Sequence, residues 1–384
     1  MYNIPLILEN SDESIFDKIK KYVNFIDIVG LNYLYFISID VDYFNRNINL
    51  GFDDIPDYVK NDIRNGFCNI IIYMGDDGNS GSEGNHDLEI LESWRIQNNF
   101  PEYSIHYFSM NLIISHVVNK KGIKICAYSM FYNSHTYVDT PFKITDNSFF
   151  DIGIPTEFDY KLFLNYNQNP HKHRIYFILK LIENLLLNDG IVSFSDFPEE
   201  YHRHSFYDLI SITNFSKNTI STFENLLPIK INNLYVHDYT KNLGQSVVID
   251  DFKKTFFSVI SETTVFDDTI YISEKTTKVI AVGHPFFLIS SKNSLKKLKE
   301  LGYKTFDKWW DESYDMCDDY MKRIDMIINE IEKIKLKSYT ELVNMRNDMY
   351  DVLHHNQQLF KKICLNDEQP VFDTINKIYK NISE

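Results

Sequence analysis

The chain has 384 residues, which is too many for one ordinary core and predicts two domains of about 150–200 residues each. It is 44% hydrophobic and 15% aromatic, a composition that supports large buried cores and argues against disorder. Its 39 basic and 54 acidic residues give a net charge of −15, which disfavours sequence-independent binding to nucleic acid or anionic membranes, because such binding needs a basic surface.

The cysteines and the N-terminus bear on the compartment. Cys68, Cys126, Cys317 and Cys364 are far apart and form no CxxC pair, so we expect free thiols and no zinc site. No run reaches the roughly 18–20 apolar residues of a membrane span, and the N-terminus lacks a basic region followed by a long apolar run. We therefore expect a soluble, cytoplasmic protein without a membrane span, and the sequence leaves its oligomeric state open.

Strands and helices alternate in the first part of the chain. Ile15, Ile19, Val23 and Ile26 recur at helical spacing after Ser11 and predict an amphipathic helix. Strands are predicted at 4–8, 34–39, 67–74, 103–111 and 123–129, and helices at 55–64 and 88–96. This rhythm predicts an α/β domain over residues 1–157, with a linker around Pro155.

A second series of strands and helices follows over residues 158–384. Strands are predicted at 161–164, 191–194, 234–237, 256–260 and 286–289, and helices at 175–187 and 275–282. The apolar stripe from Ile324 to Ile334 predicts a helix, and a second helix is expected from Leu342 to Phe360. The predicted fold class is therefore α/β with a helical C-terminal tail, and the sequence leaves open whether the last helices return to the first domain.

The stretch around residue 274 is the first candidate site. A buried strand ends near Ser261, and Ser273 can cap a helix that begins at Glu274. The start of a helix offers unpaired N–H groups and partial positive charge, and Lys275 adds a full charge, so the junction suits a pyrophosphate. Glu274 can accept hydrogen bonds from a ribose diol, and Tyr271 can cover a base. Spacing alone favours an ordinary helix start with a surface Glu and Lys.

A second candidate is the loop from Asn165 to Arg174, which joins a strand to a helix. Arg174 can hold a phosphate through two parallel hydrogen bonds, and Lys172 lies beside it. The alternative is a basic surface turn.

The third candidate is the Gly-rich loop from Gly75 to Asp87, which follows a predicted strand. Activation of an acceptor hydroxyl needs a carboxylate base, and Glu83, Asp76, Asp77 and Asp87 are candidates. Hard cations also take oxygen ligands, although the loop lacks the regular acidic spacing of a calcium hand. A solvated polar loop is the alternative.

Two of these segments resemble a known family. Residues 257–263 followed by Tyr271-Ile272-Ser273-Glu274-Lys275 resemble the signature of Lewis-type fucosyltransferases, in which Phe-Glu-Asn precedes Tyr-Val-Thr-Glu-Lys and a helix. The Asn169-Pro170 loop that leads to Arg174 is similar to another part of that family. Residues 272–315 resemble fucosyltransferase-like proteins of large viruses and phages, which would place the protein in a host cytoplasm.

The resemblance implies two Rossmann-like domains that face each other across a cleft, the GT-B type, with the donor in the C-terminal domain. It implies that Glu274 binds the ribose, that Lys275 and Arg174 bind the diphosphate, and that Tyr271 lines the nucleotide pocket. Glu262 would lie near the donor sugar. Ser261 and Thr263 depart from the Phe and Asn of the family pattern, which leaves the identity of the sugar open.

Together these features predict an inverting glycosyltransferase that moves a sugar, with GDP-fucose favoured as donor, to a glycan hydroxyl. Glu83 is the first choice for the catalytic base, and Asp76 and Asp77 follow. No obligatory metal is expected, because Lys275, Arg174 and a helix start can neutralise the leaving diphosphate. The alternatives are a catalytically silent nucleotide- or sugar-binding protein and a glycosyltransferase that acts on modified DNA. Another phosphate-handling α/β enzyme is disfavoured, because the chain has no Walker loop and no GxGxxG.

Overall fold

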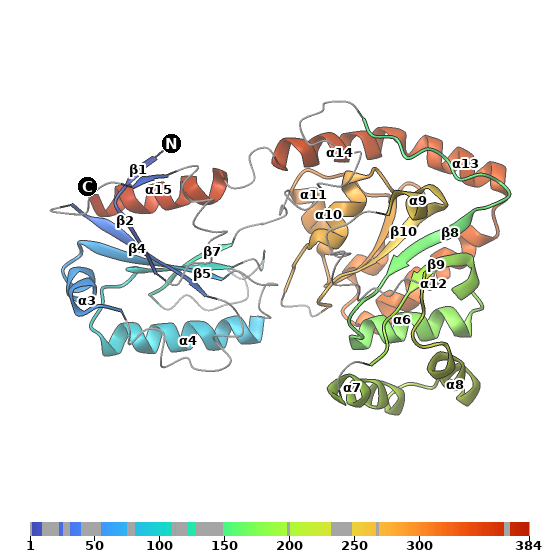
Figure 1. The fold of residues 1–384 in the computed structure, drawn as a ribbon, viewed down its shortest axis with the longest axis horizontal. Helices are drawn as coiled ribbons and strands as arrows, with labels where there is room; N and C mark the ends of the chain where they lie inside the picture. Colours follow the sequence, from blue (N-terminus) through green and yellow to red (C-terminus); the bar gives the residue numbers. More distant parts are fainter. Residues whose placement is uncertain are drawn as a thin grey trace. The chain divides into compact units, whose positions relative to one another are not determined.

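The computed structural model describes residues 2–9, 23–25, 31–39, 55–74, 81–109, 112, 122–127, 149–197, 200–231, 248–265, 269–364 and 369–383. The chain divides into two compact units (Figure 1). The first unit comprises residues 1–130, 268–271 and 366–384, and the second comprises residues 131–267 and 272–365. The contacts thus divide the chain before the predicted boundary at residue 157 and return its last residues to the first unit.

A five-stranded parallel sheet forms the centre of the first unit. Its strands, in spatial order, are β2 (Leu6–Glu9), β4 (Tyr33–Ile39), β5 (Cys68–Met74), β6 (Ile105–Ser109) and β7 (Lys124–Ala127). The helices α3 (Asp57–Arg64) and α4 (Gly81–Gln97) cover one face (Figure 1). The spatial order of the five strands follows the chain without a reversal.

The other face of this sheet is covered by the C-terminal helix α15 (Gln369–Ser383), drawn in red in Figure 1. Phe372 and Ile375 of this helix are buried in one cluster with Leu34, Phe36 and Ile71 of the sheet. These apolar residues recur at helical spacing, so α15 presents one apolar face to the strands. The question that the sequence leaves open is settled for this helix, because α15 packs on the first unit.

A short parallel pair lies beside this sheet in the same unit. Strand β1 (Tyr2–Ile4) pairs with β3 (Val23–Phe25). Val23 was assigned to an amphipathic helix by its spacing from Ile15 and Ile19, and that assignment is wrong for Val23. A β-branched residue fits a strand as well as a helix, and here strand pairing outweighs the short helical pattern.

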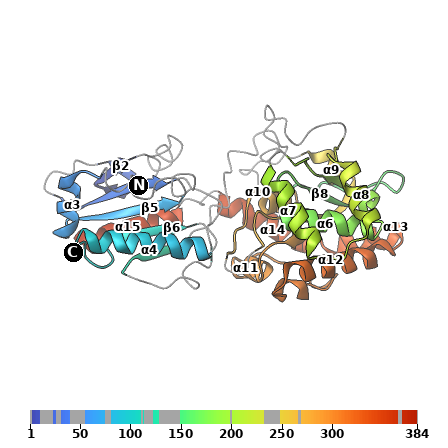
Figure 2. The same cartoon turned by 90° about the horizontal axis from the view of Figure 1, so that it is seen from below.

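The second unit contains a four-stranded parallel sheet. Its strands, in spatial order, are β11 (Phe286–Ile289), β10 (Thr255–Ser261), β8 (Lys161–Tyr166) and β9 (Gly190–Ser193). Helix α6 (Lys172–Glu183) joins β8 to β9, and α10 (Glu274–Ala281) joins β10 to β11. These two crossovers run in opposite directions along the sheet, so right-handed connections place α6 and α10 on opposite faces (Figures 1 and 2).

The strand order reverses inside this sheet. From β8 the chain moves outward to β9, and then returns to place β10 on the opposite side of β8. The carboxyl ends of β8 and β10 therefore flank a topological switch point. In open α/β sheets this crevice is where ligands bind, because the two following helices diverge from it.

The remaining helices surround the sheet of the second unit. They are α7 (Glu200–Ser211), α8 (Lys217–Leu226), α9 (Ile249–Lys253), α11 (Ser294–Glu300), α12 (Tyr320–Lys335), α13 (Tyr339–Asp348) and α14 (Tyr350–Cys364), with 3-10 turns at Leu187–Asp189 and Ser313–Met316. The predicted stripe from Ile324 to Ile334 is buried in α12. The helix expected from Leu342 to Phe360 is two helices, interrupted at Met349.

The predicted α/β class, with two parallel sheets and a helical C-terminal region, is confirmed. The strands predicted at 256–260 and 286–289 and the helix between them correspond to β10, β11 and α10. Helices α7 and α8 occupy a segment in which no element was predicted. The strand predicted at 234–237 lies outside the described residues.

Candidate functional site

The start of α10 is held in place by Glu262, the residue that follows β10. Its carboxylate accepts a hydrogen bond from the backbone N–H of Ser273 at 3.0 Å, and others from the hydroxyls of Ser273 and Thr276. Ser273 is the N-cap of α10, and its hydroxyl oxygen accepts a bond from the N–H of Lys275, as the sequence predicted. Glu262 is 0% exposed. Its carboxylate thus orients the helix start, whereas the family resemblance implied a place near the donor sugar.

Lys275 and Glu274 lie together in the first turn of α10. The ammonium of Lys275 is 3.2 Å from the hydroxyls of Thr263 and Ser273 and 3.3 Å from Oε1 of Glu274. Burial favours a raised pKa for Glu274, but the charges of Lys275 and Lys278 outweigh it and hold this pKa below its usual value. An ionised carboxylate and an ammonium therefore stand side by side at a helix start, and both side chains keep solvent exposure.

Arg174 is buried, and its guanidinium is hydrogen-bonded to main-chain carbonyls near the end of β10. Its Nη1 donates a hydrogen bond to the carbonyl of Asn169 at 3.0 Å. Its Nη2 donates to the carbonyls of Ser261 at 3.3 Å and Glu262 at 3.0 Å. With 3% exposure, the guanidinium links the β8–α6 loop to the end of β10. The sequence predicted a phosphate ligand, and the observed contacts are those of a residue that fixes the two strand ends.

Two histidines extend this connection. The Nε2–H of His173 donates to the carbonyl of Glu262 at 2.9 Å, and its ring stacks on that of His171 with centroids 5.8 Å apart. Burial, followed by the positive charges of Arg174 and Lys275, lowers the pKa of His171 to about 4. The pKa of His173 also lies well below its usual value, chiefly through burial. Both rings are neutral at pH 7, mainly because they are buried, and the nearby positive charges of Arg174 and Lys275 add to the lowering of both pKa values.

Asparagines connect the ends of β8 and β10 directly. The Nδ2 of Asn165 donates to the carbonyl of Val259 at 2.7 Å and lies 3.4 Å from the hydroxyl of Ser261. Asn167 donates to the side-chain oxygen of Asn165. Both residues belong to the loop that the sequence marks as a candidate site, but neither was assigned a role there. Two asparagines that alternate along the end of a buried strand are the signal that could have identified this network.

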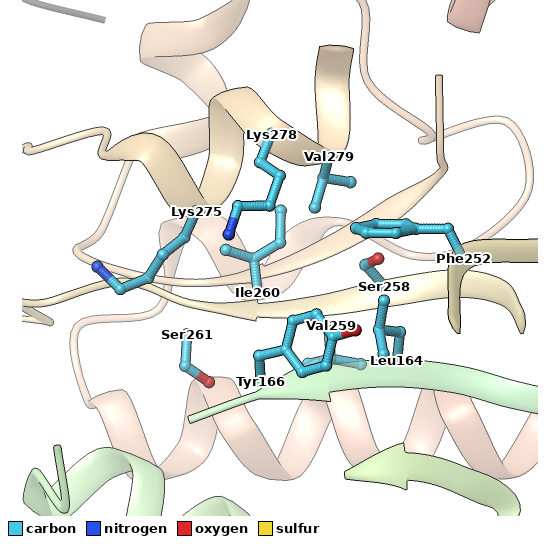
Figure 3. Close-up of a pocket in the computed structure, with 10 residues that line it drawn as sticks. All are labelled: Leu164, Tyr166, Phe252, Ser258, Val259, Ile260, Ser261, Lys275, Lys278 and Val279. Atoms are coloured by element: carbon cyan, nitrogen blue, oxygen red, sulfur yellow. The ribbon is translucent and has the colours of Figure 1, made fainter. Parts of the chain in front are cut away.

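A pocket opens beside this network, on the α10 face of the sheet (Figure 3). Tyr166 and Phe252 form part of its wall, and the hydroxyl of Tyr166 donates to Asp251 at 2.6 Å. Lys275 and Lys278 contribute the basic groups, and the sequence analysis did not single out Lys278. The lining residues are Leu164, Tyr166, Phe252, Ser258, Val259, Ile260, Ser261, Lys275, Lys278 and Val279.

Several other residues of the resembling segments have internal roles. Nε2–H of His284 donates to the carbonyl of Thr255, and its Nδ1 accepts from the hydroxyl of Ser258, both at 2.9 Å. The carboxylate of Glu312 accepts bonds from Thr305 and Phe306. His284 and Glu312 thus hold neighbouring backbone segments together. These contacts explain why a histidine and a glutamate are found at these two positions of residues 272–315.

The remaining predicted site residues lie elsewhere. Asn169 is exposed, and its carbonyl accepts the bond from Arg174. Tyr271 belongs to the first unit and packs against the cluster that contains α15. Glu83 lies in α4, which begins at Gly81, so the glycine-rich loop expected there is helical from that residue onward. Asp76 and Asp77 lie outside the described residues.

In the part of the chain that the structure describes, no group of three or more histidine, cysteine, aspartate or glutamate side chains is arranged to hold a metal ion. None of the described helices combines the length and the apolar character that crossing a membrane requires.

Comparisons with known proteins identify similar solved structures only. HepE of Anabaena, in complex with UDP and glucose, is 9% identical, with a TM-score of 0.45 over 97% of this chain and 99% of that chain. Trehalose-6-phosphate synthase OtsA is 10% identical, with a TM-score of 0.43 over 94% and 74% of the two chains. An E. coli trehalose-6-phosphate structure bound with UDP-2-fluoro glucose is 9% identical, with a TM-score of 0.41 over 92% and 75%. No family model and no curated protein matches the sequence.

Proposed function

We propose that the protein is a glycosyltransferase whose nucleotide-sugar donor binds at the switch point of the second unit. The observation that carries this proposal is the position of Lys275. It stands on the first turn of the capped helix α10, directly beyond the carboxyl ends of β8 and β10, where the strand order reverses. A diphosphate at this place would meet a helix start and a full positive charge together.

The surrounding contacts favour a preformed site. Glu262 and Arg174 are engaged in fixing the strand ends and the start of α10, so the backbone that would face the diphosphate is held before the ligand arrives. A site that is already ordered loses less conformational entropy on binding. In this proposal Lys275 binds the diphosphate directly, Arg174 positions the backbone, and Glu274 accepts hydrogen bonds from the ribose hydroxyls.

The donor sugar and the acceptor are proposed from the family resemblance. The Tyr271-Ile272-Ser273-Glu274-Lys275 motif favours GDP-fucose as donor, transfer with inversion and a glycan hydroxyl as acceptor. The base that takes the proton of that hydroxyl is proposed to be Glu83, with Asp76 and Asp77 as the next candidates. If Glu83→Gln left transfer at the full rate, this choice of base would be wrong.

Thermal unfolding of the full chain with GDP, UDP, GDP-fucose and UDP-glucose tests the donor site. A ligand at about 100 times its Kd should raise the Tm by roughly 5 °C. Lys275→Ala should abolish the increase, and Lys322→Ala, which removes the same charge from an exposed position on α12, should preserve it. If none of the four ligands stabilises the chain, the proposal fails. If a ligand stabilises the chain, but the chain neither transfers the sugar to a glycan hydroxyl nor hydrolyses the donor, the catalytically silent binding protein is favoured.

A further inference from the structure

Lys278 is a lysine whose position the proposed donor site does not yet explain. It lies on α10, one turn after Lys275, and its side chain lines the pocket (Figure 3). It is only 6% exposed. Burying an ammonium group is costly unless the surroundings compensate it, so a lysine at this position calls for a reason.

The walls around Lys278 are mostly uncharged. Strand β10 contributes no ionisable side chain, and the opposite wall contributes Tyr166, which is bonded to Asp251. On α10 itself, Glu274 favours the charged form of Lys278, and Lys275 opposes it. Two ammonium groups on successive turns thus share the single carboxylate of α10.

Helix α14 packs behind α10 and completes these surroundings. Its contact includes a hydrogen bond from Gln357 to the carbonyl of Ala281. The helix carries His354, His355 and the buried Lys361, together with the exposed Asp351 and Lys362. After burial, the charges of Glu274 and Lys275, both on its own helix, shift the pKa of Lys278 most directly.

We propose that Lys278 is a second anion-binding residue of this pocket, and that its ammonium pairs with a phosphate oxygen of a bound nucleoside diphosphate. This inference rests on the proposed donor site. It adds to that site an anion-binding residue that lies outside the motif from Tyr271 to Lys275. Lys275 meets the diphosphate at the start of the helix, and Lys278 meets it one turn deeper. A diphosphate bound there would bring negative charge next to both ammonium groups.

The ionisation of Lys278 gives this proposal a distinctive signature. Burial lowers the pKa of Lys278 to about 8, so at pH 8.5 the amine of the unliganded protein is largely neutral. An anion that pairs with the ammonium favours the protonated form and raises this pKa. Binding at pH 8.5 should therefore take up a substantial fraction of a proton.

Other groups do not produce the same signal at that pH. A terminal phosphate, with a second pKa near 6, is already deprotonated. His171, with a pKa of about 4, is neutral and far from its titration range. Proton uptake at pH 8.5 would therefore report on an amine in the pocket.

Isothermal titration calorimetry of the full chain with GDP and with UDP tests the proposal. Titrations at pH 8.5 in two buffers of different ionisation enthalpy give the number of protons taken up. We expect uptake in the wild type, no uptake in Lys278→Met, and an affinity loss of about 10-fold or more for this variant at pH 7. Lys322→Met removes an exposed charge of α12 and should change neither quantity.

The outcomes separate this inference from the proposed function. If the wild type binds a nucleotide without proton uptake and Lys278→Met binds it within twofold as tightly, the role of Lys278 is refuted and the donor site stands. If neither nucleotide binds the wild type, the donor site fails and this inference fails with it. Circular dichroism checks the fold of Lys278→Met, and if that variant does not fold, the wild-type proton count decides.

Discussion

The carboxylate of Glu262 accepts a hydrogen bond at 3.0 Å from the backbone N–H of Ser273, the N-cap of α10. The two residues are eleven positions apart, so this bond closes the segment between the end of β10 and the start of α10. The same acidic residue offers its main-chain carbonyl to Arg174 and His173. Glu262 thus links the helix start to the loop of the neighbouring strand.

Replacing Glu262 with Gln should therefore destabilise the second unit. The amide keeps the volume of the side chain but replaces one acceptor oxygen with a donor, which would face the N–H or hydroxyl groups that now donate to it. A buried network that loses an acceptor should cost about 2–4 kcal/mol. Urea unfolding measures the loss, and Glu224→Gln, at an exposed position on α8, should be neutral. Equal stability of Glu262→Gln and wild type would contradict this role.

Arg174 and Lys275 should give opposite results in a paired experiment. Arg174→Ala removes three hydrogen bonds to main-chain carbonyls, two of which belong to the buried residues Ser261 and Glu262, and should cost about 3 kcal/mol of stability. Lys275→Ala removes a partly exposed charge, so it should leave stability within about 1 kcal/mol and reduce nucleotide binding.

Urea unfolding and nucleotide titration of both variants provide the measurement. If Arg174→Ala kept full stability and lost only nucleotide binding, the arginine would be a phosphate ligand, as its sequence position suggested. Loss of stability in Lys275→Ala with unchanged binding would reverse the assignment of the two residues.

Lys278 should make the stability of the second unit depend on pH. The pKa of Lys278 is about 8 in the folded protein, against an ordinary value of 10.5. Below pH 8 both states are protonated, and the folded state carries the cost of a buried charge, on the order of 3 kcal/mol. Between these pKa values the unfolded chain binds more protons than the folded one, so the free energy of unfolding should rise with pH.

Lys278→Met should consequently be more stable than wild type at pH 7, by up to about 3 kcal/mol, and the difference should shrink towards pH 10. In a Trp94→Phe background the remaining tryptophans are Trp309 and Trp310, both in the second unit. Tryptophan fluorescence then reports the unfolding of the second unit alone. Lys322→Met in the same background is the control. A difference between Lys278→Met and wild type that does not change with pH would contradict this prediction.

The elements of the second sheet were predictable because their signals are local. The apolar runs at 256–260 and 286–289 are long enough to require burial, and Ser273 before Glu274 is a standard helix start. The spatial order of the strands was not predictable in the same way. This order depends on which earlier strand each later strand pairs with. The residue pattern within one strand does not determine its pairing partner.

Side-chain roles were harder to predict than elements. Arg174, Lys275 and Glu262 are all compatible with phosphate or sugar binding by residue type, but only Lys275 reaches the pocket. Arg174 and Glu262 form hydrogen bonds between residues that are 88 and 11 positions apart in the chain. Lys278 gave no signal, because a lysine on a helix is usually exposed, whereas this one lines a pocket against residues of β8 and β10.

The packing of the C-terminal helix α15 on the first unit could also not be predicted from the sequence, and the last prediction concerns this contact. Phe372, Ile375 and Ile378 of α15 are buried against the sheet of the first unit. Each such side chain contributes about 2 kcal/mol by burial, so deletion of residues 369–384 should strongly destabilise that unit. Ile375→Ala should cost about 2–4 kcal/mol, and Lys377→Ala, at an exposed position on the same helix, should cost little.

Hydrogen exchange measured by mass spectrometry localises this effect. Peptides that cover β4 and β5 should exchange faster in Ile375→Ala, because local opening follows the stability of the unit that contains them. Peptides from β8 and β10 should keep the exchange rates of the wild type, since α15 belongs to the other unit. Unchanged exchange in β4 and β5 after deletion of 369–384 would show that the first unit folds without α15, and an increase confined to β8 and β10 would assign the helix to the second unit.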